Sequence, residues 1–258
     1  MVPRALTIAT SDSGGGAGIQ ADLKAFAAAG VHGMSALVAL TAQNTTAVTA
    51  VHELPPAFVR AQLEAVFDDI GVDAAKTGML FSKQLIATVA DFLEQHRVPL
   101  VVDPVMVASS GAKLLLHDAV ETLVARLFPL ATVVTPNLSE AVALAGFDGT
   151  RRELAERLGE LGAPAVIVTG GHGDTAVDHL FDGERHVEIP VERHYVRATH
   201  GAGCTHSATL AALLAKGLPL EEAAREAARA ASEAVRLGLV EIGAGEGPVD
   251  VLNLRGAA

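Results

Sequence analysis

A glycine-rich segment that contains the chain's single cysteine has the residue types best suited to catalysis. Thr199-His200-Gly201-Ala202-Gly203-Cys204-Thr205 is followed at once by the alanine-rich run Ala208 to Ala215, which predicts a helix. Glycines before a helix let backbone N–H groups and the positive helix end converge on an anion. A thiol there is expected to have a lowered pKa, as a proton acceptor or nucleophile needs. The segment predicts phosphoryl transfer; the alternative is a tight turn with a buried cysteine.

A second glycine-rich loop, Ser11-Asp12-Ser13-Gly14-Gly15-Gly16-Ala17-Gly18, follows the first predicted strand. It is not a dinucleotide-binding fingerprint, because its glycine spacing differs and the second predicted strand ends at Thr41-Ala42-Gln43 without an acidic ribose ligand. It is not a Walker A loop either, since no Gly-Lys-Ser/Thr follows. We predict that it surrounds a small substrate, with a plain capping turn as the alternative.

Two carboxylates are candidates for a magnesium site. Glu140 lies three residues after Asn137 at the start of a predicted helix, where the pair fits either a capping box or a carboxylate directed at hydrated Mg²⁺. Asp103 ends an apolar strand just before Pro104, as a turn former or a second carboxylate near the metal. The residue types leave both alternatives open.

Three further side chains are candidates for contact with a flat heterocyclic substrate. The amide of Gln43 offers a donor and an acceptor side by side, which suits an aminopyrimidine edge, although it could simply cap its strand. Asp22 is either solvated or directed at substrate. Met79 could cover a ring, although packing in the core is the more common role of methionine.

These residues depend on an alternation of short apolar strands and amphipathic helices. We expect strands at Ala5–Thr10, Ser35–Thr41, Ala74–Thr77, Leu100–Asp103, Thr132–Thr135 and Ala165–Thr169. We expect helices at Gly18–Ala29, Ala57–Ile70, Lys83–Gln95, Asp118–Phe128, Leu138–Leu144, Ala202–Lys216 and Leu220–Leu237. Strands this apolar are buried on both faces, which predicts a three-layer α/β/α fold with a mostly parallel central sheet.

The stretch Asp174–Pro190 departs from this alternation. The runs Ala176–Phe181 and His186–Pro190 flank Asp182-Gly183-Glu184 and predict a hairpin, and another short pair is expected at Ala47–Glu53. With no repeat or low-complexity linker, we expect one domain over residues 1–258. Ligands of open α/β sheets bind beyond the carboxyl ends of the strands, where the polar residues of this chain collect.

Composition excludes several classes of protein. The formal net charge is −11 and there is no basic patch with aromatic residues, which argues against a nucleic-acid partner. No apolar run is long enough to cross a membrane, and the N-terminus has no signal-peptide profile. One cysteine excludes an internal disulfide framework, so we expect a cytoplasmic protein.

In combination, these segments resemble a known family. The N-terminal stretch from Thr7 to Lys24 resembles the signature of bacterial hydroxymethylpyrimidine/phosphomethylpyrimidine kinases, thiamine-biosynthetic members of the ribokinase-like superfamily. The similarity continues in order over nearly the whole chain. It includes Ala42-Gln43-Asn44-Thr45, Lys76-Thr77-Gly78-Met79-Leu80, Val102-Asp103-Pro104-Val105-Met106, Thr135-Pro136-Asn137-Leu138-Ser139-Glu140-Ala141, Gly170-Gly171-His172 and Thr199–Thr205.

The resemblance implies a ribokinase-like fold and phosphorylation of 4-amino-5-hydroxymethyl-2-methylpyrimidine and of its monophosphate, with ATP and Mg²⁺. It implies catalytic roles for Cys204 as the base and for Gly201, Ala202 and Gly203 as the anion hole. It implies substrate contacts from Gln43, Asp22, Met79, Thr10 and Met106. It implies nucleotide contacts from Asn137, Thr169, Gly171 and Thr199, and Mg²⁺ held by Glu140 and Asp103. A homodimer is expected through the region near Ala47–Glu53, because relatives often pair through such lids.

Three positions differ from the family's usual pattern. Thr10 replaces a glycine beside the substrate ring, and Ser109 and Thr169 stand where relatives often carry lysines. Lys113 is a candidate for the missing charge, within a predicted flap at Val107–Lys113. The alternatives are a pyridoxine or pyridoxal kinase of the same superfamily, and a catalytically weak ligand sensor.

Overall fold

The predicted alternation of strands and helices is present, and the strands pair into one sheet. The computed structural model describes residues 1–106, 117–170 and 176–256. The strands are β1 (Arg4–Asp12), β2 (His32–Gln43), β3 (Val48–Glu53), β4 (Ala74–Thr77), β5 (Leu100–Val102), β6 (Val133–Val134), β7 (Val166–Val168), β8 (Val177–Phe181) and β9 (His186–Pro190). The helices are α1 (Gly18–Ala28), α2 (Pro56–Ala65), α3 (Lys83–Gln95), α4 (His117–Leu127), α5 (Leu138–Ala145), α6 (Arg151–Glu160), α7 (Ala202–Ala215) and α8 (Leu220–Arg236).

The order of the strands places a crevice beside β1. The sheet runs β3-β2-β1-β4-β5-β6-β7-β8-β9, with β2, β1, β4, β5, β6 and β7 parallel to one another. From β1 the chain adds β2 on one side and later β4 on the other, so the direction of the strand order switches there. Ligands of open parallel sheets bind at such a switch, outside the carboxyl ends of the strands. The polar residues of β1 and of the turns after β4, β5 and β6 come together at this edge.

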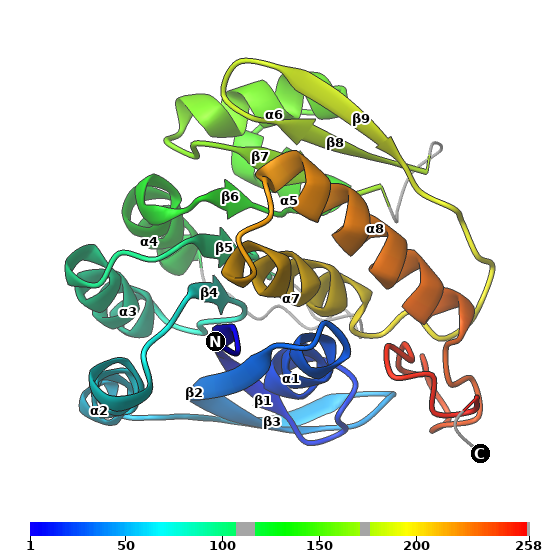
Figure 1. Ribbon diagram of the computed structural model, residues 1–258, viewed down its shortest axis with the longest axis horizontal. Coiled ribbons are helices and arrows are strands. Elements are labelled where there is room, and N and C mark those ends of the chain that lie inside the picture. Colours follow the sequence, from blue (N-terminus) through cyan, green and yellow to red (C-terminus); the bar gives the residue numbers. More distant parts are fainter. Residues whose placement is uncertain (107–116, 171–175, 257–258) are drawn as a thin grey trace.

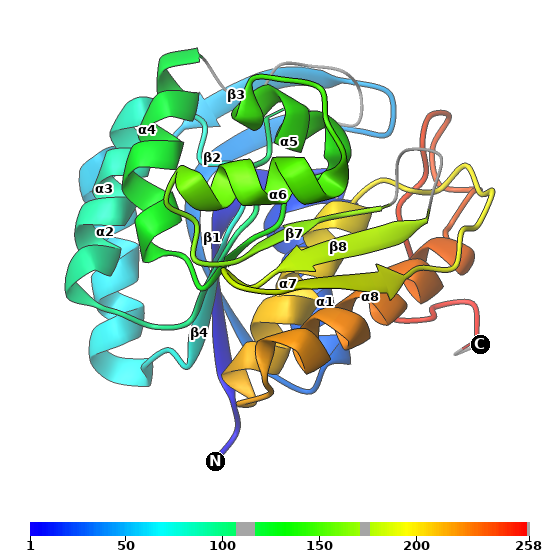
Figure 2. The same cartoon turned by 90° about the horizontal axis from the view of Figure 1, so that it is seen from above.

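Helices cover both faces of the sheet, as predicted (Figure 1; Figure 2). One core joins α2, α3, α4, α5 and α6 to strand residues such as Leu6, Ile8 and Val102. The other joins α1, α7 and α8 to Ala5 and Val101. Alternate residues of one strand therefore point to opposite layers, as the period of a strand requires. The three-layer α/β/α fold with a mostly parallel sheet is confirmed.

The structure differs from the predicted elements in two places. Helix α6 was not predicted; it begins at a capping box of Thr150 and Glu153 and buries Leu154 and Leu158 in an otherwise charged sequence. Strand β3 is not half of a separate pair, since it lies antiparallel to β2 at the edge of the main sheet. No helix in the described part of the chain is both long and apolar enough to cross a bilayer.

Candidate active site

Helix α7 begins with a glycine whose conformation other residues rarely adopt. Gly201 is the N-cap residue, with φ +85°, and a Cβ at this position would overlap the carbonyl oxygen of Gly16. The first turn of a helix leaves N–H groups without intrahelical acceptors, so the backbone here can bind an anion. Gly203, the second residue of α7, has open space where a Cβ would stand. The two glycines thus have different functions: Gly201 allows the close approach of the two loops, and Gly203 leaves room.

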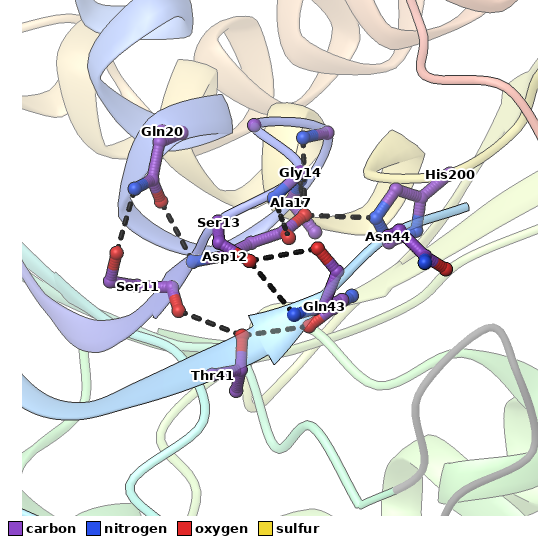
Figure 3. Close-up of polar contacts among 12 residues, drawn as sticks. Ser11, Asp12, Ser13, Gly14, Ala17, Gln20, Thr41, Gln43, Asn44 and His200 are labelled. Carbon is purple, nitrogen blue, oxygen red and sulfur yellow. Dashed lines mark hydrogen bonds and ion pairs between the residues drawn. The ribbon is translucent and has the colours of Figure 1, made fainter. Parts of the chain in front are cut away.

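The loop after β1 is tied to the start of α7 by Asp12 and His200 (Figure 3). Asp12 accepts hydrogen bonds from the backbone of Gly14 (2.8 Å) and Ala17 (2.9 Å), and its Oδ2 lies 3.0 Å from His200 Nε2. Burial opposes the charged carboxylate, but the hydrogen bonds from His200, Ala17 and Gly14 outweigh it and lower the pKa of Asp12. This contact joins segments 188 residues apart in sequence.

Gln43 is held at the end of β2 by its neighbours (Figure 3). The Thr41 hydroxyl lies 2.9 Å from the Ser11 carbonyl oxygen and 3.1 Å from Gln43 Oε1. The Ser13 hydroxyl donates to the Gln43 carbonyl and accepts from its N–H, each at 2.8 Å. The Thr41 hydroxyl lies beside the amide oxygen of Gln43, and the amide NH₂ group offers two donors for a ligand.

A cavity of about 750 Å³ lies at the carboxyl ends of the parallel strands. Its lining brings together most of the residues that the sequence predicted: Thr10, Gln43, Met79, Asp103, Asn137, Glu140, Thr169, Thr199, Gly201, Ala202, Gly203 and Cys204. The Thr10 hydroxyl donates to the Met79 carbonyl at 3.0 Å. Gly171 and the predicted flap Val107–Lys113 lie outside the described residues.

Asp22 does not line this cavity, contrary to expectation. It is fully buried beneath it, where Oδ2 accepts from Thr7 Oγ1 at 2.6 Å and both carboxylate oxygens lie 3.0 Å from Lys76 Nζ. Lys76 is also fully buried, and its Nζ lies 3.8 Å from Asp103 Oδ2. Burial opposes the charge of Lys76, but the carboxylates, Asp22 first, raise its pKa. Asp22 therefore compensates a buried cation below the site.

Met106 is also absent from the lining. Its side chain is half-buried against the core between the sheet and α2–α6, and its backbone N–H donates to Glu140 Oε1 at 3.4 Å. The preceding Val105 lines the cavity instead. Met106 thus contacts the metal candidate Glu140 through its backbone, and its side chain belongs to the core.

Glu140 and Asn137 form the capping box that the sequence allowed. The Asn137 side chain accepts from the Glu140 N–H, and Glu140 Oε2 accepts from the Asn137 N–H, both at 2.9 Å. Glu140 nonetheless lines the cavity, and burial together with the charge of Asp103 raises its pKa to about 8. Glu140 and the neighbouring Asp103 fit a hydrated Mg²⁺, which needs few protein ligands. The described residues hold no cluster of three or more metal-binding side chains, so nucleotide and water oxygens would complete the coordination.

The expectation of a lowered pKa for Cys204 is wrong. The thiol is half-buried at the first turn of α7, and desolvation raises its pKa to about 12. Lys76 and a backbone hydrogen bond with Gly18 act in the opposite direction, but they do not outweigh burial and the charges of Asp22 and Asp103. The helix end alone does not decide the pKa of the thiol, because burial raises it most and the nearby carboxylates raise it further.

Several titratable lining residues were given no role in the sequence, among them His200, Lys76, Asp178 and His206. A signal existed for Lys76, because a charged residue inside the short apolar strand Ala74–Thr77 needs a buried partner. Asp178 and His206 gave no such signal. They meet only when β8 and α7 pack against each other near the sheet edge.

The comparisons with known proteins agree with this geometry. The model of the phosphomethylpyrimidine kinase family matches residues 12–250. The hydroxymethylpyrimidine/phosphomethylpyrimidine kinase of Rhizobium meliloti (strain 1021) is 51% identical over 260 residues, which cover 96% of this chain and 97% of that protein.

Two solved structures are similar over most of their length. The ADP complex of Bacillus subtilis pyridoxal kinase has a TM-score of 0.86 and 40% identity, covering 99% of each chain. The phosphomethylpyrimidine kinase of Clostridium difficile 630 has a TM-score of 0.78 and 39% identity, covering 88% of this chain and 96% of that chain. From its sequence, its fold and the residues gathered at its cavity, this chain belongs to the phosphomethylpyrimidine kinase family.

Proposed function

We propose that this enzyme transfers a phosphoryl group from ATP to 4-amino-5-hydroxymethyl-2-methylpyrimidine and then to its monophosphate, in thiamine biosynthesis. The observation that carries the proposal is one cavity that joins the N-terminus of α7 to Gln43 and Met79 on one side and to Thr169 and Ser232 on the other. A small heterocycle and a nucleotide therefore have a common space in which to meet.

The pyrimidine is proposed to bind beside Gln43, Met79 and Thr10. The free NH₂ group of Gln43 suits a ring nitrogen, which is an acceptor. The Thr10 hydroxyl donates its proton to the Met79 carbonyl, so we expect this threonine to contact the ligand by van der Waals packing and not to donate a hydrogen bond to it. These contacts hold the ring with its hydroxymethyl group towards α7.

The N-terminus of α7 is proposed to receive the charge that develops on the transferred phosphoryl group. Positioning and charge stabilisation dominate phosphoryl transfer, so the backbone of Gly201, Ala202 and Gly203 is suited to this role. Asn137, Thr169 and Thr199 line the same space and are proposed to contact the nucleotide. Glu140 and Asp103 would hold Mg²⁺, which supplies neutralisation of phosphate charge when bound.

Cys204 is proposed to accept the proton of the substrate hydroxyl group. With a pKa raised to about 12, the thiol is largely protonated at neutral pH in the free protein. A reaction that depends on the thiolate is therefore expected to accelerate about tenfold per pH unit between about pH 6 and 9. This slope should be lost when the thiol is removed.

The Cys204→Ala variant tests the proposed base. We expect kcat to fall at least about 100-fold, the usual contribution of a general base, while the affinity for the pyrimidine changes little. The measurement is a coupled assay of ADP release across the pH range. A fall of less than about threefold, or a pH slope that persists in the variant, excludes the thiol as the base.

Turnover with different acceptors tests the substrate. The same assay compares the pyrimidine, its monophosphate and pyridoxal, because the similar B. subtilis structure is a pyridoxal kinase. We expect the highest kcat/KM for the two pyrimidines. A higher value for pyridoxal would make the vitamin B6 kinase the correct assignment, and no turnover with any acceptor would favour a ligand sensor.

The same proposal includes the domain organisation, location, partners and oligomeric state of the enzyme. We propose one kinase domain over residues 1–258, a cytoplasmic location, no nucleic-acid or membrane partner, and a homodimer. The dimer is supported by the exposed edge strand β3, whose residues Thr49 to His52 are all exposed. Edge strands carry unpaired backbone groups and are natural pairing surfaces.

A further inference from the structure

His206 is a buried side chain of the cavity wall for which the proposed mechanism has no role. It lies on α7, four residues after Ala202 and three after Gly203, so the three residues share one face of the helix. Helical side chains lean towards the N-terminus of their helix, which brings the imidazole below the anion-binding turn. The residue is 4% exposed and lines the cavity.

The imidazole of His206 has polar capacity that the described residues do not use. Neither ring nitrogen has a hydrogen-bond partner among them. Nε2 lies 3.3 Å from Asp178 Oδ2, at ion-pair distance. Buried polar side chains nearly always find hydrogen-bond partners, so an Nδ1 with no partner among the described residues, in a cavity wall, indicates a group that arrives with a ligand.

Asp178 fixes this histidine beside the nucleotide side of the cavity. It is 3% exposed, and its Oδ1 accepts a hydrogen bond from the Gly170 N–H at 2.6 Å. Asp178 thus connects His206 to the segment that follows β7, where Thr169 and Gly170 line the cavity. An imidazole with a proton on each nitrogen can donate from Nε2 to Asp178 and from Nδ1 to a ligand oxygen.

Positive charge is scarce in the described part of this wall. Lys76 is committed to Asp22, and the lining otherwise contributes Arg193 as a permanently charged cation. A nucleoside polyphosphate carries several negative charges, which need donors near the N-terminus of α7. The chemistry that matches an unpartnered imidazole there is a phosphate oxygen.

We propose that His206, held by Asp178, is a binding residue for the phosphate chain of the nucleotide. The inference rests on the proposed kinase function and adds a hydrogen-bond donor for the nucleotide phosphates. His206 contacts a phosphate oxygen, and Asp178 acts as a positioning residue that orients the ring. The nucleoside part of the ligand is outside its reach.

Binding measurements without an acceptor substrate test this role. Isothermal titration calorimetry with ADP and with adenosine is compared for wild type, His206→Leu and His206→Gln. We expect His206→Leu to weaken ADP binding at least about tenfold, as loss of one charge-assisted hydrogen bond does, and to leave adenosine binding unchanged. His206→Gln keeps a donor and is expected to lie between the two.

His179→Leu is the matched control. His179 is the next residue of β8, is also buried, and pairs with His186 at 2.9 Å rather than with the cavity. Its removal costs a buried imidazole in the hairpin that carries Asp178 and should leave the affinity for ADP unchanged. Thermal melting identifies any variant that fails to fold. If His206→Leu fails to fold, the ratio of ADP to adenosine affinity in His206→Gln tests the phosphate contact instead.

Three outcomes would overturn the assignment. One is ADP affinity in folded His206→Leu within about twofold of wild type. Another is an equal loss for ADP and adenosine, which would indicate a contact with the nucleoside or a general disturbance of the cavity. Wild-type protein that binds neither ADP nor adenosine would reject the kinase function itself, and His206 with it.

Discussion

Glu140 illustrates how one residue can serve both the fold and the site. Its carboxylate completes the capping box of α5, yet burial and Asp103 raise its pKa to about 8, above the ordinary 4.5. Between these two values the folded protein holds a proton that the unfolded chain has released. Stability therefore decreases as pH rises from about 4.5 to about 8. The ionised Glu140 carboxylate can bind Mg²⁺, but it lowers the free energy of unfolding of the metal-free protein.

The Glu140→Gln variant should lose this pH dependence. Glutamine at this position keeps the capping box, so the helix start is preserved while the titration disappears. With metal removed by EDTA, we expect wild type to lose stability relative to the variant between pH 5 and pH 8, measured by thermal melting. Parallel curves for the two proteins across that range would contradict the raised pKa.

At the scale of residues, local motifs were predictable and long-range charges were not. Gly201 at the helix start and the pair Asn137 and Glu140 follow from patterns within a few residues of sequence. The pKa of Cys204 is raised first by burial and then by Asp22 and Asp103, which lie far from it in sequence, so the helix end gave the wrong direction. Asp22 was placed in the pocket for the same reason: its partner Lys76 is 54 residues away.

At the scale of elements, the buried pair of Lys76 and Asp22 connects β4 to α1 below the cavity. Removal of one partner leaves an uncompensated buried charge. We therefore expect Lys76→Met to lower the free energy of unfolding by about 3–5 kcal/mol. The double variant Lys76→Met/Asp22→Asn should recover much of the loss. Urea unfolding followed by circular dichroism measures both.

Lys83→Met is the control for this pair, since Lys83 is exposed at the start of α3. It should change the free energy of unfolding by no more than about 0.5 kcal/mol. If Lys76→Met is as mild as this control, or if the double variant is less stable than Lys76→Met, the buried pair does not have the role described.

Elements with a clear apolar period were predicted almost to the residue. Helix α3 is Lys83–Gln95, as expected, and the parallel strands lie within the expected runs or extend them by a few residues. Helix α6 was missed because charged residues dominate it, although its capping box was visible in the sequence. The partner of β3 could not be predicted, because pairing with β2 depends on the position of the sheet edge and not on the composition of β3.

At the scale of the whole molecule, the order of motifs carried more information than any one of them. Each segment alone allowed a structural alternative, but their order along the chain implied the family that the comparisons then identified. The sheet explains why: most of the segments follow neighbouring parallel strands, and Thr199–Thr205 begins the helix beside them, so a fixed order of motifs corresponds to a fixed arrangement around one crevice.

The proposed homodimer makes a prediction about the exposed edge of the sheet. Val51 of β3 and Leu40 of β2 are large apolar side chains exposed by 37% and 40%, on an edge strand that pairs only with β2 among the described residues. Val51 lies opposite Thr41 and Leu40 opposite His52, so the two side chains point to opposite faces, and we expect a second copy to cover Val51. We place Val51 near the twofold axis, where a residue lies close to its own copy, so Val51→Lys should repel its counterpart and shift the protein towards monomer.

Light scattering coupled to size exclusion measures this shift, with a wild-type mass of twice that of the chain expected at micromolar concentration. Phe147→Lys is the control, because Phe147 is also exposed but follows α5, on a different part of the molecule. A wild-type monomer would reject the dimer. If the Val51→Lys protein stays dimeric, the dimer interface does not include β3. Turnover measured on the same sample shows whether catalysis in the cavity depends on this edge.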